Sequence, residues 1–99
     1  MADVPAGAVY VKREDVVLRE VAGEHILVPI RSGAADLQAI FALNGAALRI
    51  WELLDGARTV DAILAAMLER YDVTAEQARA DLGAFLQRLL AAGLVDRRD

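Results

Sequence analysis

The chain contains no cysteine, so it can form no disulfide and has no thiolate to bind a metal or act as a nucleophile. It has a single histidine, His25, and a single serine, Ser32, and nothing in the local sequence supports a catalytic triad between them. Glycine-rich phosphate-binding motifs are also missing. General acid–base and nucleophilic catalysis need several converging groups. We therefore expect a chain that is not an enzyme and carries no metal or cofactor.

Basic residues are too few for a nucleic-acid binder. Lys and Arg number 11 against 15 Asp and Glu, which gives a net charge of −4, whereas neutralising phosphates supplies most of the affinity for nucleic acid. No apolar run approaches the roughly 20 residues that cross a membrane. The first eight residues lack the basic and apolar regions of a signal peptide. These absences predict a cytoplasmic domain with no nucleic-acid and no membrane partner.

The first half of the chain has the pattern of strands. Three runs are rich in β-branched or apolar residues, and they are residues 16–21, 25–30 and 38–43. Ala22 and Gly23 separate the first two runs and predict a tight turn in which Gly23 has a positive φ. Residues 31–37 are predicted to form a loop, and Val9 and Tyr10 favour an additional, earlier strand.

The second half has the spacing of helices. Three amphipathic segments follow one another, at residues 45–54, from 60 to about 71, and from 75 to about 92. Asn44, Thr59 and Thr74 precede them as N-caps, and Gly56 and Gly93 follow the first and third as C-terminal stops. Strands followed by helices predict an α+β domain, with an antiparallel sheet packed on three helices.

The third predicted strand, residues 38–43, has neither a charge nor a proline. Strands joined in hairpin order place it at an edge of the sheet, and natural edges usually carry charges or prolines that prevent pairing. The edge formed by the first strand has such charges in Arg19 and Glu20. An unguarded edge suits the addition of a partner strand. The alternative is that the third helix or the N-terminal arm covers this edge.

The apolar arc of the third predicted helix is wider than one packing contact requires. Leu82 and Phe85 lie near its centre, and Leu86 and Leu90 extend it to one flank, beside Arg79. This width either lines a groove for the apolar side chains of a peptide or serves as core in a small domain.

Several of these segments, taken in order, resemble the PqqD-like family. The segments that show this resemblance are FALNGAALRIWELLDG at residues 41–56, RTV at 58–60, VLREV at 17–21 and LLAAGLV at 89–95. The resemblance covers residues 8–96 as a single domain, with residues 1–7 and 97–99 as flexible termini. It implies a winged-helix-like fold in which a three-stranded antiparallel sheet precedes three helices.

The resemblance also implies a function. Members of this family are peptide chaperones that bind the leader of a ribosomally made precursor and present it to a modifying enzyme, which for the PqqD proteins is a radical SAM enzyme. The leader lies as an added strand along the third strand, in the groove towards the third helix. The peptide-binding residues implied here are Gln38, Ala39, Ile40, Phe41, Ala42 and Leu43 on the strand, and Arg79, Leu82, Gly83, Leu86 and Leu90 on the helix.

Two alternatives belong to other classes. A winged-helix DNA-binding regulator would need a basic third helix, whereas Glu76 and Asp81 balance Arg79 and Arg88 there. A structural subunit of a maturation enzyme would dock through the helices without binding a leader.

Overall fold

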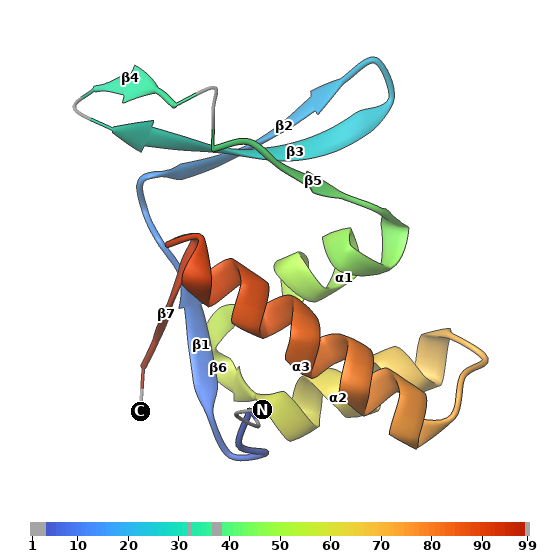
Figure 1. Cartoon of the computed structure of the whole chain (residues 1–99). Coiled ribbons are helices and arrows are strands. Elements are labelled where there is room, and N and C mark those ends of the chain that lie inside the picture. Colours follow the sequence, from blue (N-terminus) through green and yellow to red (C-terminus); the bar gives the residue numbers. More distant parts are fainter. Residues whose placement is uncertain (1–3, 32, 37–38, 99) are drawn as a thin grey trace.

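The computed structural model describes residues 4–31, 33–36 and 39–98, which form two sheets and three helices (Figure 1). The elements, in chain order, are β1 (Val9–Lys12), β2 (Val16–Val21), β3 (Glu24–Arg31), β4 (Ala34–Ala35), β5 (Phe41–Leu43), α1 (Gly45–Leu53), β6 (Asp55–Thr59), α2 (Val60–Arg70), α3 (Ala75–Ala91) and β7 (Val95–Arg97). The predicted α+β class is confirmed.

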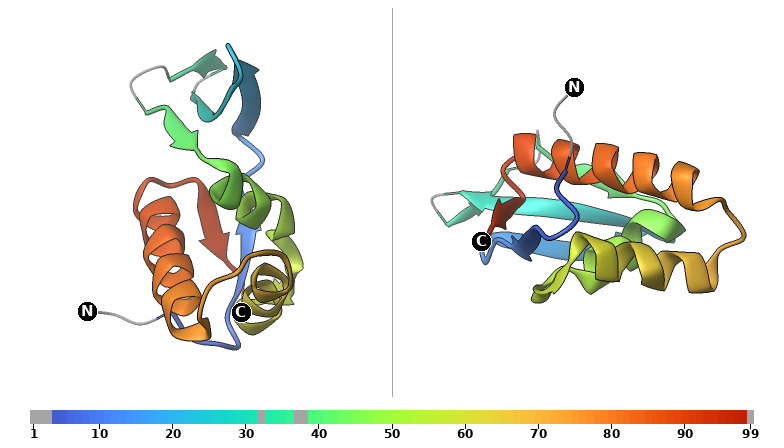
Figure 2. Two further views of the ribbon diagram at one scale, coloured as in Figure 1. Left: turned by 90° about the vertical axis from the view of Figure 1, so that its right-hand side faces the viewer. Right: turned by 90° about the horizontal axis from the view of Figure 1, so that it is seen from below.

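The outer sheet contains the predicted strands. β2 and β3 form a hairpin whose turn residues Ala22 and Gly23 have φ values of 54° and 82°, as predicted for Gly23. β4 and β5 both pair antiparallel with the other side of β3. β4 lies in the segment predicted to be a loop. Figures 1 and 2 show this sheet at one end of the molecule, beyond the helices.

The inner sheet has the order β6-β1-β7 and joins three distant parts of the chain. β1 confirms the earlier strand predicted at Val9 and Tyr10, whereas β6 and β7 were not predicted. Backbone bonds continue past β1 and β7, since the Arg98 N–H donates to the Val9 carbonyl at 2.8 Å and the Asp61 N–H donates to the Ala6 carbonyl at 3.0 Å. These bonds tie the C-terminal end of the described chain to β1 and its N-terminal segment to the start of α2.

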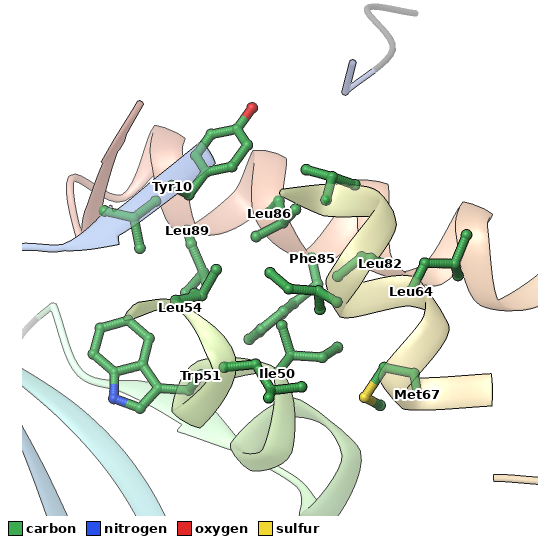
Figure 3. Close-up of a cluster of buried hydrophobic side chains, with 14 of the residues drawn as sticks. Tyr10, Ile50, Trp51, Leu54, Leu64, Met67, Leu82, Phe85, Leu86 and Leu89 are labelled. Carbon is green, nitrogen blue, oxygen red and sulfur yellow. The ribbon is translucent and has the colours of Figure 1, made fainter. Parts of the chain in front are cut away.

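The three helices begin where their capping residues predict. The side chains of Asn44, Thr59 and Thr74 accept from the N–H three residues on, at 2.8, 3.2 and 3.1 Å. Gly56 does not end α1, which stops at Leu53, although its φ of 78° is positive as a stop requires. It lies instead within β6. Side chains from all three helices meet in one core, drawn in Figure 3.

Candidate functional site

β5 forms an edge of the outer sheet. One side of it pairs with β3, in the register His25 to Leu43 and Leu27 to Phe41, and no described strand pairs with its other side. The strand is shorter than the predicted 38–43. The Ala39 N–H donates to the Asp36 carbonyl at 3.2 Å, so this part of the chain is bent, and Gln38 lies outside the described residues. The open edge is therefore centred on Ala42.

Backbone hydrogen bonds of β3 determine which groups of β5 face outwards. The Ile30 N–H donates to the Asp15 carbonyl on the β2 side, and the Pro29 carbonyl accepts from Asp36 on the other side. Because this direction alternates along an antiparallel strand, Leu27 and His25 direct their polar groups at β5. Phe41 and Leu43 then exchange bonds with β3. The N–H and C=O of Ala42 face the open edge, where an added strand would pair with them.

The side chains of β5 alternate between the two faces of the sheet. Ala42 is exposed, Leu43 is buried, and Phe41 is half-buried against the helical core. Phe41 meets Phe85 of α3 at 6.0 Å between ring centroids. An aromatic contact between β5 and α3 therefore joins the edge strand to the helix.

A hollow of about 290 Å³ lies between α1 and α3, next to this contact. Its lining residues are Asn44, Ala46, Ala47, Ile50, Asp81, Ala84, Phe85 and Arg88. The Arg88 guanidinium lies 5.5 Å from the Phe41 ring centroid and 5.8 Å from that of Phe85. We name the open edge of β5 and this hollow, together, the edge groove. It offers unpaired backbone groups, aromatic surface and both signs of charge.

The helix residues implied by the resemblance lie elsewhere. Leu82 and Leu86 are 2% and 0% exposed and belong to the core. Arg79 and Gly83 line a second hollow, of about 430 Å³, against Val4 and α2. Helical spacing places the exposed Leu90 on this same flank. The structure therefore does not bring these residues to the edge groove, and their role in binding stays a prediction.

A helical wheel explains this difference. The width of an apolar arc shows how much of a helix is buried, but it does not show which flank faces the sheet. The flank of α3 that faces β5 carries Asp81, Ala84 and Arg88. On a helical wheel these residues fall on the polar side, which is normally exposed to solvent. Asp81, Phe85 and Arg88 fall on one side of the helix, four and three residues apart, but this spacing does not show that the side faces β5.

The groups considered for catalysis do not meet. The His25 imidazole lies 3.4 Å from a Glu20 carboxylate oxygen on the outer hairpin, and Ser32 lies outside the described residues. Over residues 4–31, 33–36 and 39–98, no three His, Cys, Asp or Glu side chains form a group that could hold a metal ion. The same part of the chain has no helix long and apolar enough to span a membrane.

Two groups of the described chain whose pKa is shifted, Asp55 and Arg13, lie away from the edge groove. Hydrogen bonds from the backbone N–H groups of Arg58 and Ala57 lower the pKa of the Asp55 carboxyl. A side-chain hydrogen bond to Asp15, at 3.2 Å, raises the pKa of the Arg13 guanidinium, with Asp96 adding to it. Neither group faces β5, and both pKa shifts result from hydrogen bonds to residues nearby in the sequence or in the inner sheet.

The architecture defines an α+β domain with one open strand edge beside its third helix. The family model of coenzyme PQQ synthesis protein D (PqqD) matches residues 24–95, which is more than half of the chain. This chain belongs to the PqqD family, and the resemblance drawn from its sequence is confirmed.

A solved structure adds a close likeness in fold. The chain is similar to TbiB1 in complex with the TbiA(beta) leader peptide, with 26% identity and a TM-score of 0.70. The alignment covers 87% of this chain and 94% of that one, so the likeness includes nearly all of both. Among curated proteins, none matches this chain.

Proposed function

We propose that this chain is a non-catalytic adaptor that binds the leader of a ribosomally made precursor peptide and presents it to a modifying enzyme. The observation that carries the proposal is the open edge of β5, where the backbone groups of Ala42 face away from β3. Membership of the PqqD family supports it, and so does the likeness to a chain whose structure contains a leader peptide.

The leader would bind as an extended strand. Main-chain hydrogen bonds to the edge of β5 supply affinity, each worth about 0.5–1.5 kcal/mol net. Alternate side chains of the peptide enter the edge groove, because successive residues of a strand point to opposite faces. The predicted strand residues Ala39 to Leu43 form this edge and the approach to it.

The modifying enzyme supplies the chemistry, and the adaptor raises the local concentration of its substrate. Within this proposal the enzyme is a radical SAM enzyme, as the family membership favours. The encounter takes place in the cytoplasm, where ribosomes release the precursor. DNA binding is disfavoured because α3 alternates Glu76 and Asp81 with Arg79 and Arg88, and such a surface attracts no phosphate backbone.

A pair of proline variants tests the binding mode. Ala42→Pro removes an N–H that faces the open edge without removing a bond to β3. Leu18→Pro does the same at the opposite edge, because β2 residues of even number face away from β3. The probe is a labelled synthetic peptide that the wild type enriches from a displayed library of random dodecapeptides, and the readout is fluorescence anisotropy.

Ala42→Pro is expected to weaken binding at least tenfold, or about 1.4 kcal/mol, whereas Leu18→Pro leaves it unchanged. Circular dichroism confirms that both variants are folded. Equal affinity of the wild type and Ala42→Pro would exclude strand addition at β5.

A mass measurement tests the adaptor role. The precursor and its modifying enzyme are mixed with and without this protein, and the mass of the peptide is followed. Modification is expected only when all three are present. Modification by this protein alone would refute the non-catalytic role, and equal modification without it would remove the delivery role.

A further inference from the structure

Arg88 differs from four other arginines of the chain. Arg13, Arg49, Arg58 and Arg79 each lie within 4 Å of a carboxylate, on Asp15, Glu52, Asp55 and Asp61 respectively. In the described part of the chain, no carboxylate pairs with Arg88. Its guanidinium lies instead against two aromatic rings, those of Phe41 and Phe85.

The two ring contacts hold a positive charge in place and leave its donors unused. A guanidinium attracted to an aromatic face gains electrostatic energy from the ring, and its position is restricted. Its five N–H donors need acceptors such as carboxylate oxygens, which they bind in a bidentate fork. The Phe41 and Phe85 rings offer no such acceptor. Arg88 is therefore positioned, before any ligand arrives, to bind a carboxylate.

The place of this charge is inside the edge groove. Arg88 lines the hollow beside α1, and its contact with Phe41 brings it to β5. A strand paired with Ala42 would lie along this edge, and its side chains on the Phe41 side would pass Arg88 every second residue, about 6.6 Å apart. A side chain that packs on Phe41 and an acidic one beside it fit this spacing.

The other end of the groove has the opposite sign. Asp81 lies two turns earlier on α3, about 10 Å along the helix axis. The Gln77 amide donates to its carboxylate at 2.9 Å, and this bond orients it. An acidic side chain of the peptide is therefore attracted to Arg88 and repelled from Asp81, which fixes the position of the charge along the groove.

We propose that Arg88 determines which leaders this chain binds, by pairing with an Asp or Glu that neighbours an apolar residue seated on Phe41. This inference rests on the proposed function and names the chemistry of the peptide: an extended segment with one carboxylate at a fixed position. Reversing the charge at residue 88 and the charge of the peptide side chain together is therefore expected to preserve binding.

Selection from a random library supplies the probes. A displayed library of random dodecapeptides is selected on the wild type, on Arg88→Glu and on Arg70→Glu. The last variant is a matched control, with the same change of charge on an exposed arginine of α2 that does not line the edge groove. The wild type and Arg70→Glu are expected to enrich an acidic residue at one position. Arg88→Glu is expected to enrich Lys or Arg there.

Affinities of synthetic peptides complete the test. The peptide enriched on the wild type is expected to bind Arg88→Glu at least tenfold more weakly and Arg70→Glu within about threefold of the wild type. Replacing its acidic residue with Arg is expected to restore binding to Arg88→Glu. Enriched peptides with no charge preference, or with equal losses in both variants, would overturn the role of Arg88 and leave peptide binding intact. If no sequence is enriched on any variant, peptide binding itself fails, and the inference fails with it.

Discussion

The two sheets of this molecule differ in what their residues contact. The inner sheet, β6-β1-β7, lies against the helices, and Tyr10 and Val95 of its strands belong to the buried core. Leu27 and Leu43 of the outer sheet also belong to that core, but the strands of the inner sheet are in addition flanked by the buried residues Ala8, Leu54 and Leu94. The outer sheet exposes large apolar side chains, including Leu18 and Val21, and its strand β5 leaves an open edge beside α3.

This difference separates stability from binding. Burial of apolar surface is the main favourable term in folding, so residues of the helices and the inner sheet determine the stability of the domain. A strand edge that receives a partner must keep its backbone groups accessible, so it contributes less to the core. Substitutions in the inner half should therefore unfold the protein, and substitutions at the exposed Ala42 of β5 should change binding at nearly constant stability.

The largest expected effect is that of Trp51→Ala. Trp51 is 4% exposed, packs within the core drawn in Figure 3, and has the Lys12 ammonium 5.5 Å above its ring. Removing it is expected to lower the free energy of unfolding by roughly 3–5 kcal/mol, measured by urea denaturation. The indole also loses its cation–π contact.

Val21→Ala provides the control from the outer sheet. Val21 is 57% exposed, so its truncation is expected to change the free energy of unfolding by at most about 0.5 kcal/mol. Similar losses in both variants would break the comparison, because the outer sheet would then stabilise the domain as much as the inner half.

A smaller effect is expected for Gly56→Ala in the inner sheet. Gly56 has a φ of 78°, and an added Cβ would lie 2.9 Å from the Arg98 Nη1 and 3.1 Å from the Val11 Cγ2. Left-handed backbone costs a non-glycine residue about 1–2 kcal/mol, and the contact with β1 adds to this cost. We expect a loss of about 2–3 kcal/mol in the free energy of unfolding.

Gly23→Ala isolates the contribution of that contact. Gly23 has a φ of 82°, but nothing lies within 4 Å of an added Cβ at this turn of the outer sheet. Both variants therefore share the backbone strain, and only Gly56→Ala has the steric contact. If both substitutions cost the same, the packing of β6 on β1 is looser than the structure shows.

Much of this fold follows from local signals in the sequence. β2, β3 and the three capped helices are specified by β-branched runs, by Gly23 and by the hydroxyl and amide caps. β6 and β7 were not predicted, because short runs with charged residues have no periodicity. They are strands only because β1 pairs with both, and such long-range pairing leaves no local pattern.

Of the two elements that form the candidate site, the sequence predicted the strand edge but not the flank of the helix. The missing charges on residues 38–43 indicate an open edge, and the structure has that edge at β5. The flank of α3 that faces it was not predictable, because it depends on the angle at which the sheet and helix meet. Asp81 and Arg88 belong to an ordinary polar surface in the sequence, and only the contact of Arg88 with Phe41 assigns them to the groove.

The smallest expected effect concerns the pH dependence of the inner sheet, at Asp55 of β6. Its carboxylate accepts from the N–H groups of Ala57 and Arg58, both at 3.0 Å, and lies beside the Arg58 guanidinium. These contacts keep its pKa in the folded protein below the ordinary 3.8. Because the folded value lies below the unfolded one, the added stability is present above about pH 4 and is lost as pH falls through the folded pKa.

Asp55→Asn is therefore expected to be less stable than the wild type at neutral pH, and the difference should shrink as the pH falls below 4. The change is small, because the group is exposed to solvent. An NMR titration of the Asp55 carboxyl is expected to give a midpoint below 3.8. About 1 M salt screens the guanidinium but not the two backbone hydrogen bonds, so most of the shift should persist there. A midpoint that returns to 3.8 in salt would assign the effect to Arg58 alone.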